Sequence, residues 1–132
     1  MINGIHKFIG LKYEKLGRTF KGVDCWGLCV LFFKEIYGIN IPNFIEEEVL
    51  TEKDIYKTVE NKKSMFVELN VPEKDCFVLI KIRGLGTHIG LMLNEEDMLH
   101  IQNNKHTSCI EKVFSDKWKH RILGFYKYES IN

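Results

Sequence analysis

The first part of the chain carries its apolar residues at helical spacing. Intervals of three and four residues separate the apolar positions, which predicts a short helix over Ile2, Ile5, Phe8 and Ile9. Residues 10–23 contain three glycines and are expected to form a loop.

A longer helix is predicted directly after that loop. Asp24 is a favourable N-cap residue, and Gly38 stands where a helix ends, so the helix should run to Tyr37. After the N-cap, Lys34 and Glu35 are its only charged residues. We therefore expect this helix to be almost wholly buried.

The pattern changes twice in the rest of the chain. Phe44 to Lys63 is acidic first and basic later, with apolar residues at loosely helical intervals, which predicts one or two surface helices. After Ser64, short apolar runs alternate with turn residues and predict strands joined mostly by short connections, hence antiparallel. The predicted strands are Met65–Leu69, Cys76–Arg83, His88–Leu93, Met98–Gln102, Ser108–Lys112 and Ile122–Tyr128. Helices followed by strands indicate an α+β fold with the buried helix on the sheet.

Length and charge narrow the class of protein. A chain of 132 residues with 45% hydrophobic residues is expected to form one domain over residues 1–132. The net charge of +1 gives no basic excess, so we expect no nucleic-acid partner. The longest apolar run, Leu28 to Phe33, is too short for a membrane span, and residues 1–10 lack the pattern of a signal peptide. We therefore expect synthesis in the cytoplasm.

Cys25 is the first candidate for chemistry. The cysteines at positions 25, 29, 76 and 109 show no CxxC spacing, and we interpret them as thiols. Cys25 begins the buried helix, where unpaired backbone N–H groups favour the reactive thiolate. The neighbouring carboxylate of Asp24 opposes thiolate formation, so activation needs a partner such as a histidine. A small apolar residue that simply fits a helix start is the plainer interpretation.

Two histidines form the second candidate. If Leu93 pairs with Asp97 around a three-residue loop, Gly90 faces His100, and His88 lies diagonally from His100 on the same face of the hairpin. His100 can then orient one ring nitrogen of His88 while the other meets a thiol, and Gly90 would leave room for the Cys25 helix. A two- or four-residue loop would separate the rings.

Other interpretations of these residues stay open. Each histidine could be a hydrogen-bonded core residue, which is the commoner role. Zinc binding by Cys25, Cys29, His88 and His100 is the weakest alternative, because Cys-x3-Cys on a helix is not a usual zinc motif. The remaining histidines have no partner pattern and are expected at the surface: His6, His106 and His120.

Three segments of the chain resemble the NlpC/P60 family of cell-wall cysteine peptidases. The first runs from Gly10-Leu11-Lys12-Tyr13 through Gly17 and Gly22 to Asp24-Cys25-Trp26-Gly27-Leu28. The second is His88-Ile89-Gly90, and the third is Met98-Leu99-His100, at the common family interval. Two features are most similar to phage-tail members of the family: the tryptophan after the cysteine, and the segment after the helix, Tyr37-Gly38-Ile39-Asn40-Ile41-Pro42. Housekeeping wall hydrolases usually have serine directly after the cysteine.

The resemblance implies a function and roles for five residues. The fold would be papain-like, with Cys25 as nucleophile, His88 as base and His100 as the residue that orients His88. Tyr13 would lie beside the nucleophile, and Asp24 would help to hold the amino end of the substrate. The implied reaction hydrolyses peptidoglycan stem peptides, commonly between D-glutamate and the following diamino acid, without a metal or organic cofactor.

The implied partners are the stem peptide and phage-tail proteins, and the implied place of action is the cell wall, from a virion tail or after lysis. Two departures bear on this: Leu16-Gly17 stands where many members have paired glycines, and the histidine hairpin turns through Asn94-Glu95-Glu96-Asp97 without glycine. Two alternatives remain, namely a catalytically silent tail-assembly module of the same fold and a papain-like amidase or acyltransferase with a non-wall substrate.

Overall fold

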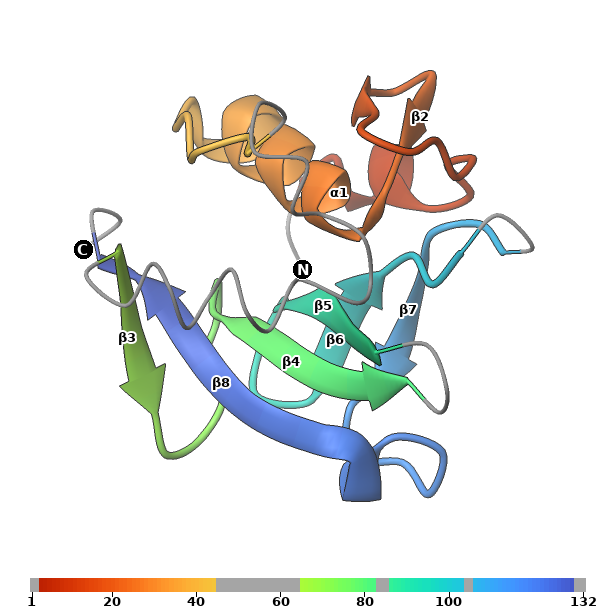
Figure 1. Cartoon of the computed structure of the whole chain (residues 1–132). Helices are drawn as coiled ribbons and strands as arrows, with labels where there is room; N and C mark the ends of the chain where they lie inside the picture. The colour runs from red at the N-terminus through yellow and green to blue at the C-terminus, as the bar shows by residue number, and fades with distance from the viewer. Residues whose placement is uncertain (1–2, 45–64, 83–85, 104–105, 130–132) are drawn as a thin grey trace.

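The computed structural model describes residues 3–44, 65–82, 86–103 and 106–129. It shows helices at one side of a large antiparallel sheet (Figure 1). The fold is therefore α+β, as the order of the sequence patterns predicts. The surface helices predicted within 44–63 lie, apart from Phe44, outside the described residues.

The segment before the long helix is more ordered than its glycines predict. The first helix is a single 3-10 turn, η1 (Ile5–Phe8). The predicted loop contains a small hairpin of β1 (Arg18–Thr19) and β2 (Gly22–Val23). The loop prediction was wrong here because Gly17 and Gly22 serve close packing: a Cβ atom on Gly17 would overlap the Gly22 carbonyl group.

The long helix begins and ends where the sequence predicts. It consists of α1 (Cys25–Phe32) and a π-helical turn, η2 (Phe33–Tyr37), and Gly38 ends it with a positive φ of 67°. Every residue of α1 except Val30 is buried. The predicted burial is confirmed for α1, whereas Lys34, Glu35 and Tyr37 of η2 are exposed.

Six strands form the main sheet. Their bounds are β3 (Phe66–Leu69), β4 (Phe77–Ile82), β5 (Gly86–Met92), β6 (Asp97–His100), β7 (Cys109–Lys112) and β8 (Ile122–Tyr128). The order across the sheet is β3-β8-β4-β5-β6-β7, and every neighbouring pair is antiparallel. The last strand of the chain thus lies between β3 and β4, which no local sequence pattern indicated.

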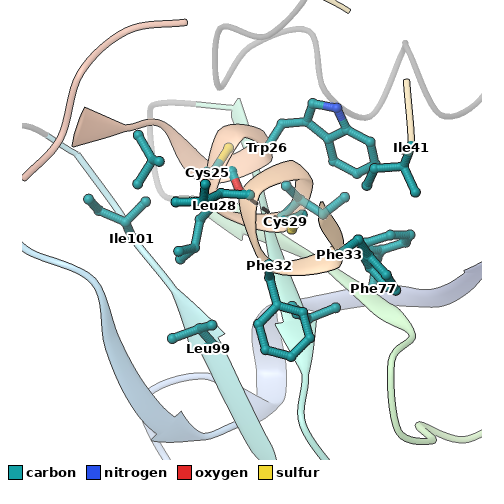
Figure 2. Close-up of a cluster of buried hydrophobic side chains, with 14 of the residues drawn as sticks. Cys25, Trp26, Leu28, Cys29, Phe32, Phe33, Ile41, Phe77, Leu99 and Ile101 are labelled. Carbon is teal, nitrogen blue, oxygen red and sulfur yellow. Dashed lines mark hydrogen bonds between the residues drawn. The ribbon is translucent and has the colours of Figure 1, made fainter. Parts of the chain in front are cut away.

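The two faces of the sheet bury separate apolar clusters. The helix face combines α1 side chains with strand residues such as Phe77 and Leu99 and with Ile101, which directly follows β6 (Figure 2). The far face buries Val78, Met98 and Trp118 with their neighbours. Because successive residues of a strand point to opposite faces, the side chains of a strand divide between the two clusters.

The hairpin between β5 and β6 has the predicted register. Leu91 pairs with Leu99, and the Leu93 N–H donates to the Asp97 carbonyl at 2.8 Å, which leaves a three-residue loop. Asn94 closes this loop: its Oδ1 accepts from the N–H groups of Glu96 and Asp97, both at 2.8 Å. A side chain therefore supplies the turn that a glycine would otherwise allow.

Gly90 serves a different neighbour from the one that we predicted. A Cβ atom there would lie 2.8 Å from Met98 Cγ and 3.3 Å from Val78 Cγ1, both on the far face. The missing side chain makes room for Met98 and not for α1. The expectation failed because Gly90 belongs to the face that the helix does not cover.

No helix in the described part of the chain is long and apolar enough to cross a membrane.

We predict that Gly27→Ala destabilises the fold. A Cβ atom on Gly27 would overlap the Gly17 carbonyl oxygen and lie 2.7 Å from Arg18 Nη1. Overpacking of this kind costs about 1–3 kcal/mol of unfolding free energy. Urea titration followed by circular dichroism measures the loss. Gly124→Ala is the matched control, because its Cβ atom would meet only the Tyr126 side chain, and equal losses in both variants would contradict the prediction.

Candidate active site

His88 and His100 form a buried hydrogen-bonded pair. His88 lies in β5 and His100 ends β6, and their side chains meet with Nε2 of His88 2.8 Å from Nδ1 of His100. His88 is fully buried and His100 is 2% exposed. The predicted hairpin register thus brings the two rings together on one face of the sheet.

Glu111 and Trp118 extend this pair, and sequence reasoning missed both. Glu111 of β7 accepts a hydrogen bond at Oε1 from Nε2 of His100 at 2.9 Å. Trp118 donates its indole N–H to Glu111 Oε2 at 3.1 Å and places its ring edge-on to His100, with centroids 5.3 Å apart. Because residues two apart in a strand point to the same face, the sequence could have placed Glu111 on the same face as Cys109. It could not show that these residues lie opposite His100, because the loop before β7 does not define how β7 pairs with β6.

The charge of Glu111 sets the direction of the hydrogen bonds. Burial alone would raise the pKa of Glu111, but hydrogen bonds from Trp118 and His100 and the charge of Lys117 hold it below its usual value. The ionised carboxylate accepts a hydrogen from His100 Nε2, which leaves His100 Nδ1 as an acceptor. His88 must then donate from Nε2 and carry a lone pair on Nδ1.

His88 Nδ1 is a buried base without a partner. Among the described residues, no atom forms a hydrogen bond with it. Burial, and secondarily the charge of His100, lower the pKa of His88 well below the usual value. Burial also lowers the pKa of His100, which Glu111 partly offsets. The His88 ring is therefore uncharged near neutral pH and can accept a proton at Nδ1.

Cys25 stands at the first position of α1, held there by Asp24. One carboxylate oxygen of Asp24 accepts from the Gly27 N–H at 2.7 Å and from Arg18 Nη1 at 2.9 Å, and the other accepts from the Leu16 N–H at 2.8 Å. This is an N-cap combined with a buried ion pair. It fixes the helix start, where the backbone dipole favours a thiolate.

The structure does not form a hydrogen bond between Cys25 and His88. Cys25 belongs to the cluster on the helix face, and strand alternation places His88 and His100 on the far face. The two sites nevertheless share one end of the strands. Ile101, which directly follows His100, belongs to the same cluster as Cys25 (Figure 2).

Tyr13 and Leu16 lie beside the helix start. The backbone of Tyr13 forms an isolated bridge with Val23, two residues before Cys25, and its side chain is partly buried. Leu16 adopts a positive φ of 62°, a conformation that favours glycine. This explains physically why glycine suits the position at which the sequence departs from the family pattern.

The other three thiols are poorly placed for reaction. Burial raises the pKa of the Cys29 thiol well above its usual value and that of Cys76 to about 11. Burial and the charge of Glu111 raise the pKa of Cys109. None of the four cysteines is in a disulfide bond, as predicted. The remaining histidines at positions 6, 106 and 120 are exposed, also as predicted.

A comparison with models of known protein families shows to which family the chain belongs. The model of the NlpC/P60 family matches residues 10–127. The chain belongs to the NlpC/P60 family.

Relatives of this NlpC/P60 chain include a curated Escherichia coli (strain K12) protein, murein DD-endopeptidase MepS/murein LD-carboxypeptidase, 24% identical over 112 residues. The match covers 85% of this chain and 53% of the relative, so the chain spans about half the length of the curated relatives that it matches.

Solved NlpC/P60 structures share the fold. The NlpC/p60 domain of the peptidoglycan hydrolase SagA has a TM-score of 0.59 at 17% identity, covering 92% of this chain and 90% of that one. A Bacillus cereus ATCC 10987 family protein gives 0.64 at 19% identity over 92% of this chain and 36% of that one. NlpC1 from Trichomonas vaginalis gives 0.66 at 13% identity, covering 96% and 42%.

We predict that iodoacetamide alkylates Cys25 of this NlpC/P60 domain at least about tenfold faster than the other three thiols at neutral pH, because the start of α1 favours the thiolate of Cys25, whereas burial raises the pKa of the other three thiols. Because burial lowers the pKa of His88, its ring stays neutral as the pH falls from about 8 to 6 and can still take the thiol proton during the reaction. Labelling of Cys25 should therefore slow by less than about tenfold per pH unit, whereas that of a free thiol slows about tenfold per unit. Peptide mass spectrometry measures each rate. His88→Ala should slow Cys25 alone, and equal labelling of all four thiols would refute the assignment.

We also predict that Glu111→Gln slows the alkylation of Cys25 by about 10- to 1,000-fold, because a neutral amide lets His100 and His88 adopt the wrong tautomer, as in other orienting-acid variants. The urea midpoint of this variant should shift by no more than that of ordinary surface substitutions, which would show that the slower labelling does not come from a loss of folding. Glu68→Gln, an exposed carboxylate on β3, is the control. Unchanged labelling in Glu111→Gln would remove Glu111 from the site.

Proposed function

We propose that this protein is a cysteine peptidase that hydrolyses peptidoglycan stem peptides at the bond between D-glutamate and the following diamino acid. One observation carries the proposal: the hydrogen bonds from Glu111 through His100 leave His88 Nδ1 as a buried, unpartnered base. A base and a second group that orients it are what a nucleophilic cysteine requires. The curated relatives are named as murein hydrolases, which supports the substrate class.

Cys25 is the nucleophile in this proposal. Its thiol gives its proton to His88 Nδ1, attacks the carbonyl carbon and forms a thioester as His88 returns the proton to the leaving amine. Water, with His88 again as base, then hydrolyses the thioester. For this proton transfer the Cys25 thiol must approach Nδ1 of His88 at the end of the strands near His100. Ile101, the residue after His100, packs in the same apolar cluster as Cys25.

Backbone N–H groups at the helix start would stabilise the oxyanion. The Gly27 N–H donates to Asp24 Oδ1 and the Leu28 N–H donates to the Asp24 carbonyl, so both are used within the helix. We propose the N–H of Cys25, next to the reacting sulfur, as the donor. A positioned donor of this kind contributes about 2.7–4 kcal/mol to transition-state stabilisation.

Tyr13 and Asp24 complete the proposed site as substrate-binding residues. Tyr13 lies alongside Val23, at the entrance to the helix start. Asp24 is fully buried and already accepts three hydrogen bonds. We propose that it acts on the amino end of the peptide with its carboxylate fixed in place by Arg18.

The phage-tail association is a further part of the proposal. Its support is the coupling between the two motifs that resemble tail members: the Trp26 indole N–H donates to the Pro42 carbonyl at 2.7 Å, and its ring stacks on Phe44 at 5.4 Å. The tryptophan after the nucleophile and the Gly-Ile-x-Ile-Pro exit thus form one structural unit. Tail proteins would then bring the enzyme to the cell wall.

A catalytically silent tail-assembly module is the second candidate. The observation in its favour is that Cys25 and His88 lie on opposite faces of the sheet. A papain-like amidase or acyltransferase that acts on another substrate would keep the same dyad. Digestion of defined substrates separates these candidates.

We predict that the wild-type protein cleaves purified stem peptides after D-glutamate, whereas Cys25→Ala leaves them intact, because that variant lacks the nucleophile. Mass spectrometry of peptides and of digested peptidoglycan identifies the bond. Cys76→Ala, which removes a buried thiol at the other end of the sheet, is the matched control and should remain active.

Each other outcome has a defined meaning. Cleavage between the two D-amino acids of a cross-link would transfer the specificity in the name of the E. coli relatives to this chain. No cleavage by folded protein whose Cys25 still labels quickly would favour the amidase or acyltransferase. No cleavage together with slow labelling would favour the silent module.

A further inference from the structure

Three side chains with metal-binding atoms converge beside the histidine pair. His100 Nε2, Cys109 Sγ and Glu111 Oε1 all lie within 4.8 Å of one another, the one such group of at least three in the described residues. His100 and Cys109 are directly paired across β6 and β7, and Glu111 stands two residues after Cys109 on the same face. The neighbouring strands are visible in Figure 1. These residues include neither Cys25 nor Cys29, so this is not the zinc set considered from the sequence.

The spacing of the three atoms suits a zinc ion. Their separations are 2.9 Å for His100 Nε2 to Glu111 Oε1, 3.7 Å for Cys109 Sγ to Glu111 Oε1, and 3.8 Å for Cys109 Sγ to His100 Nε2. A point slightly off the plane of such a triangle is about 2.1–2.3 Å from all three atoms, which matches zinc bonds to nitrogen, oxygen and sulfur. Little movement of the side chains is needed.

The surroundings hold these ligands in the required orientation. The other nitrogen of His100 is hydrogen-bonded to His88, and the other oxygen of Glu111 receives the Trp118 indole N–H and lies 3.7 Å from Lys117 Nζ. Such outer contacts are typical of metal ligands. Lys117 opposes a cation, but it contacts Oε2 and is 54% exposed, so it can move into solvent. Glu111 is 30% exposed, which gives an ion access.

We propose that His100, Cys109 and Glu111 form an inhibitory site for Zn²⁺, with a fourth position open to water. The inhibitory part rests on the proposed function. Three protein ligands of nitrogen, sulfur and oxygen with one open position are a usual zinc arrangement. The ion would take the same nitrogen of His100 that now donates to Glu111.

Binding at that nitrogen reverses the hydrogen bonds of the histidine pair. The Nε2 proton of His100 and the thiol proton of Cys109 leave to solvent, because both atoms must offer lone pairs. The His88 Nε2 proton passes to His100 Nδ1, and His88 Nδ1 gains a proton from solvent. Both rings stay neutral, but His88 now carries its hydrogen on Nδ1 and can no longer accept the proton of Cys25.

Metal binding is tested first in the Cys25→Ala protein, so that the nucleophile cannot supply the sulfur. Co²⁺ should produce a thiolate-to-metal absorption band in the near ultraviolet, with one equivalent bound and displaced by Zn²⁺. Adding Cys109→Ser should abolish the band and weaken Zn²⁺ binding by more than about 100-fold, beyond the loss typical of outer-contact changes. Adding Cys76→Ser instead is the matched control and should change neither.

The inhibitory role is tested by the alkylation rate of Cys25, which needs no peptide substrate. One equivalent of Zn²⁺ should slow the labelling of Cys25 in the wild type and should not change it in Cys109→Ser, each rate being compared with that of the same protein without metal. No band, or a band that survives Cys109→Ser, overturns the site. A site that binds Zn²⁺ without slowing Cys25 overturns the inhibition. Failure to cleave stem peptides affects neither measurement, so the two proposals fail separately.

Discussion

The buried carboxylate of Asp24 holds together the part of the fold that positions Cys25, the proposed nucleophile. It caps α1 through the Gly27 N–H, pairs with Arg18 and receives the Leu16 N–H. Arg18 in turn donates to the carbonyl groups of Gly17 and Asn43, so the glycine loop and the chain after the helix are tied to the same point. Breaking a buried pair of this kind typically costs about 3–5 kcal/mol. The position of Cys25 is thus a consequence of one ion pair.

The sheet divides the candidate chemistry into two parts. The helix face carries the thiol, and the far face carries an ordered chain of hydrogen bonds from Trp118 through Glu111 and His100 to His88. Because Glu111 is ionised, it must accept the hydrogen of His100 Nε2, and His100 Nδ1 must then accept from His88 Nε2. The lone pair of His88 is therefore on Nδ1, the ring nitrogen that faces away from His100. The far face therefore fixes the tautomer of His88, the proposed base, in a buried position beside Trp118.

The same direction makes the base sensitive to whatever occupies His100 Nε2. A carboxylate there favours the basic tautomer of His88, whereas a cation there would favour the opposite one. The sulfur of Cys109 makes this group of side chains suitable for a thiophilic metal ion, in addition to its hydrogen bonds. Catalytic positioning and metal sensitivity would then be two properties of a single nitrogen atom.

The sequence by itself determined the helix start, the strands and the histidine pair, because each depends on neighbouring residues. Asp24 and Gly38 delimit the helix, and the three-residue loop closed by Asn94 sets the register that joins His88 to His100. Only the tertiary structure decided which face each side chain occupies, where β8 inserts and that Glu111 reaches His100. Those features depend on pairings between distant segments, whose register no local turn fixes. For that reason the structure, and not the sequence, separated Cys25 from the histidines and assigned Gly90 to Met98.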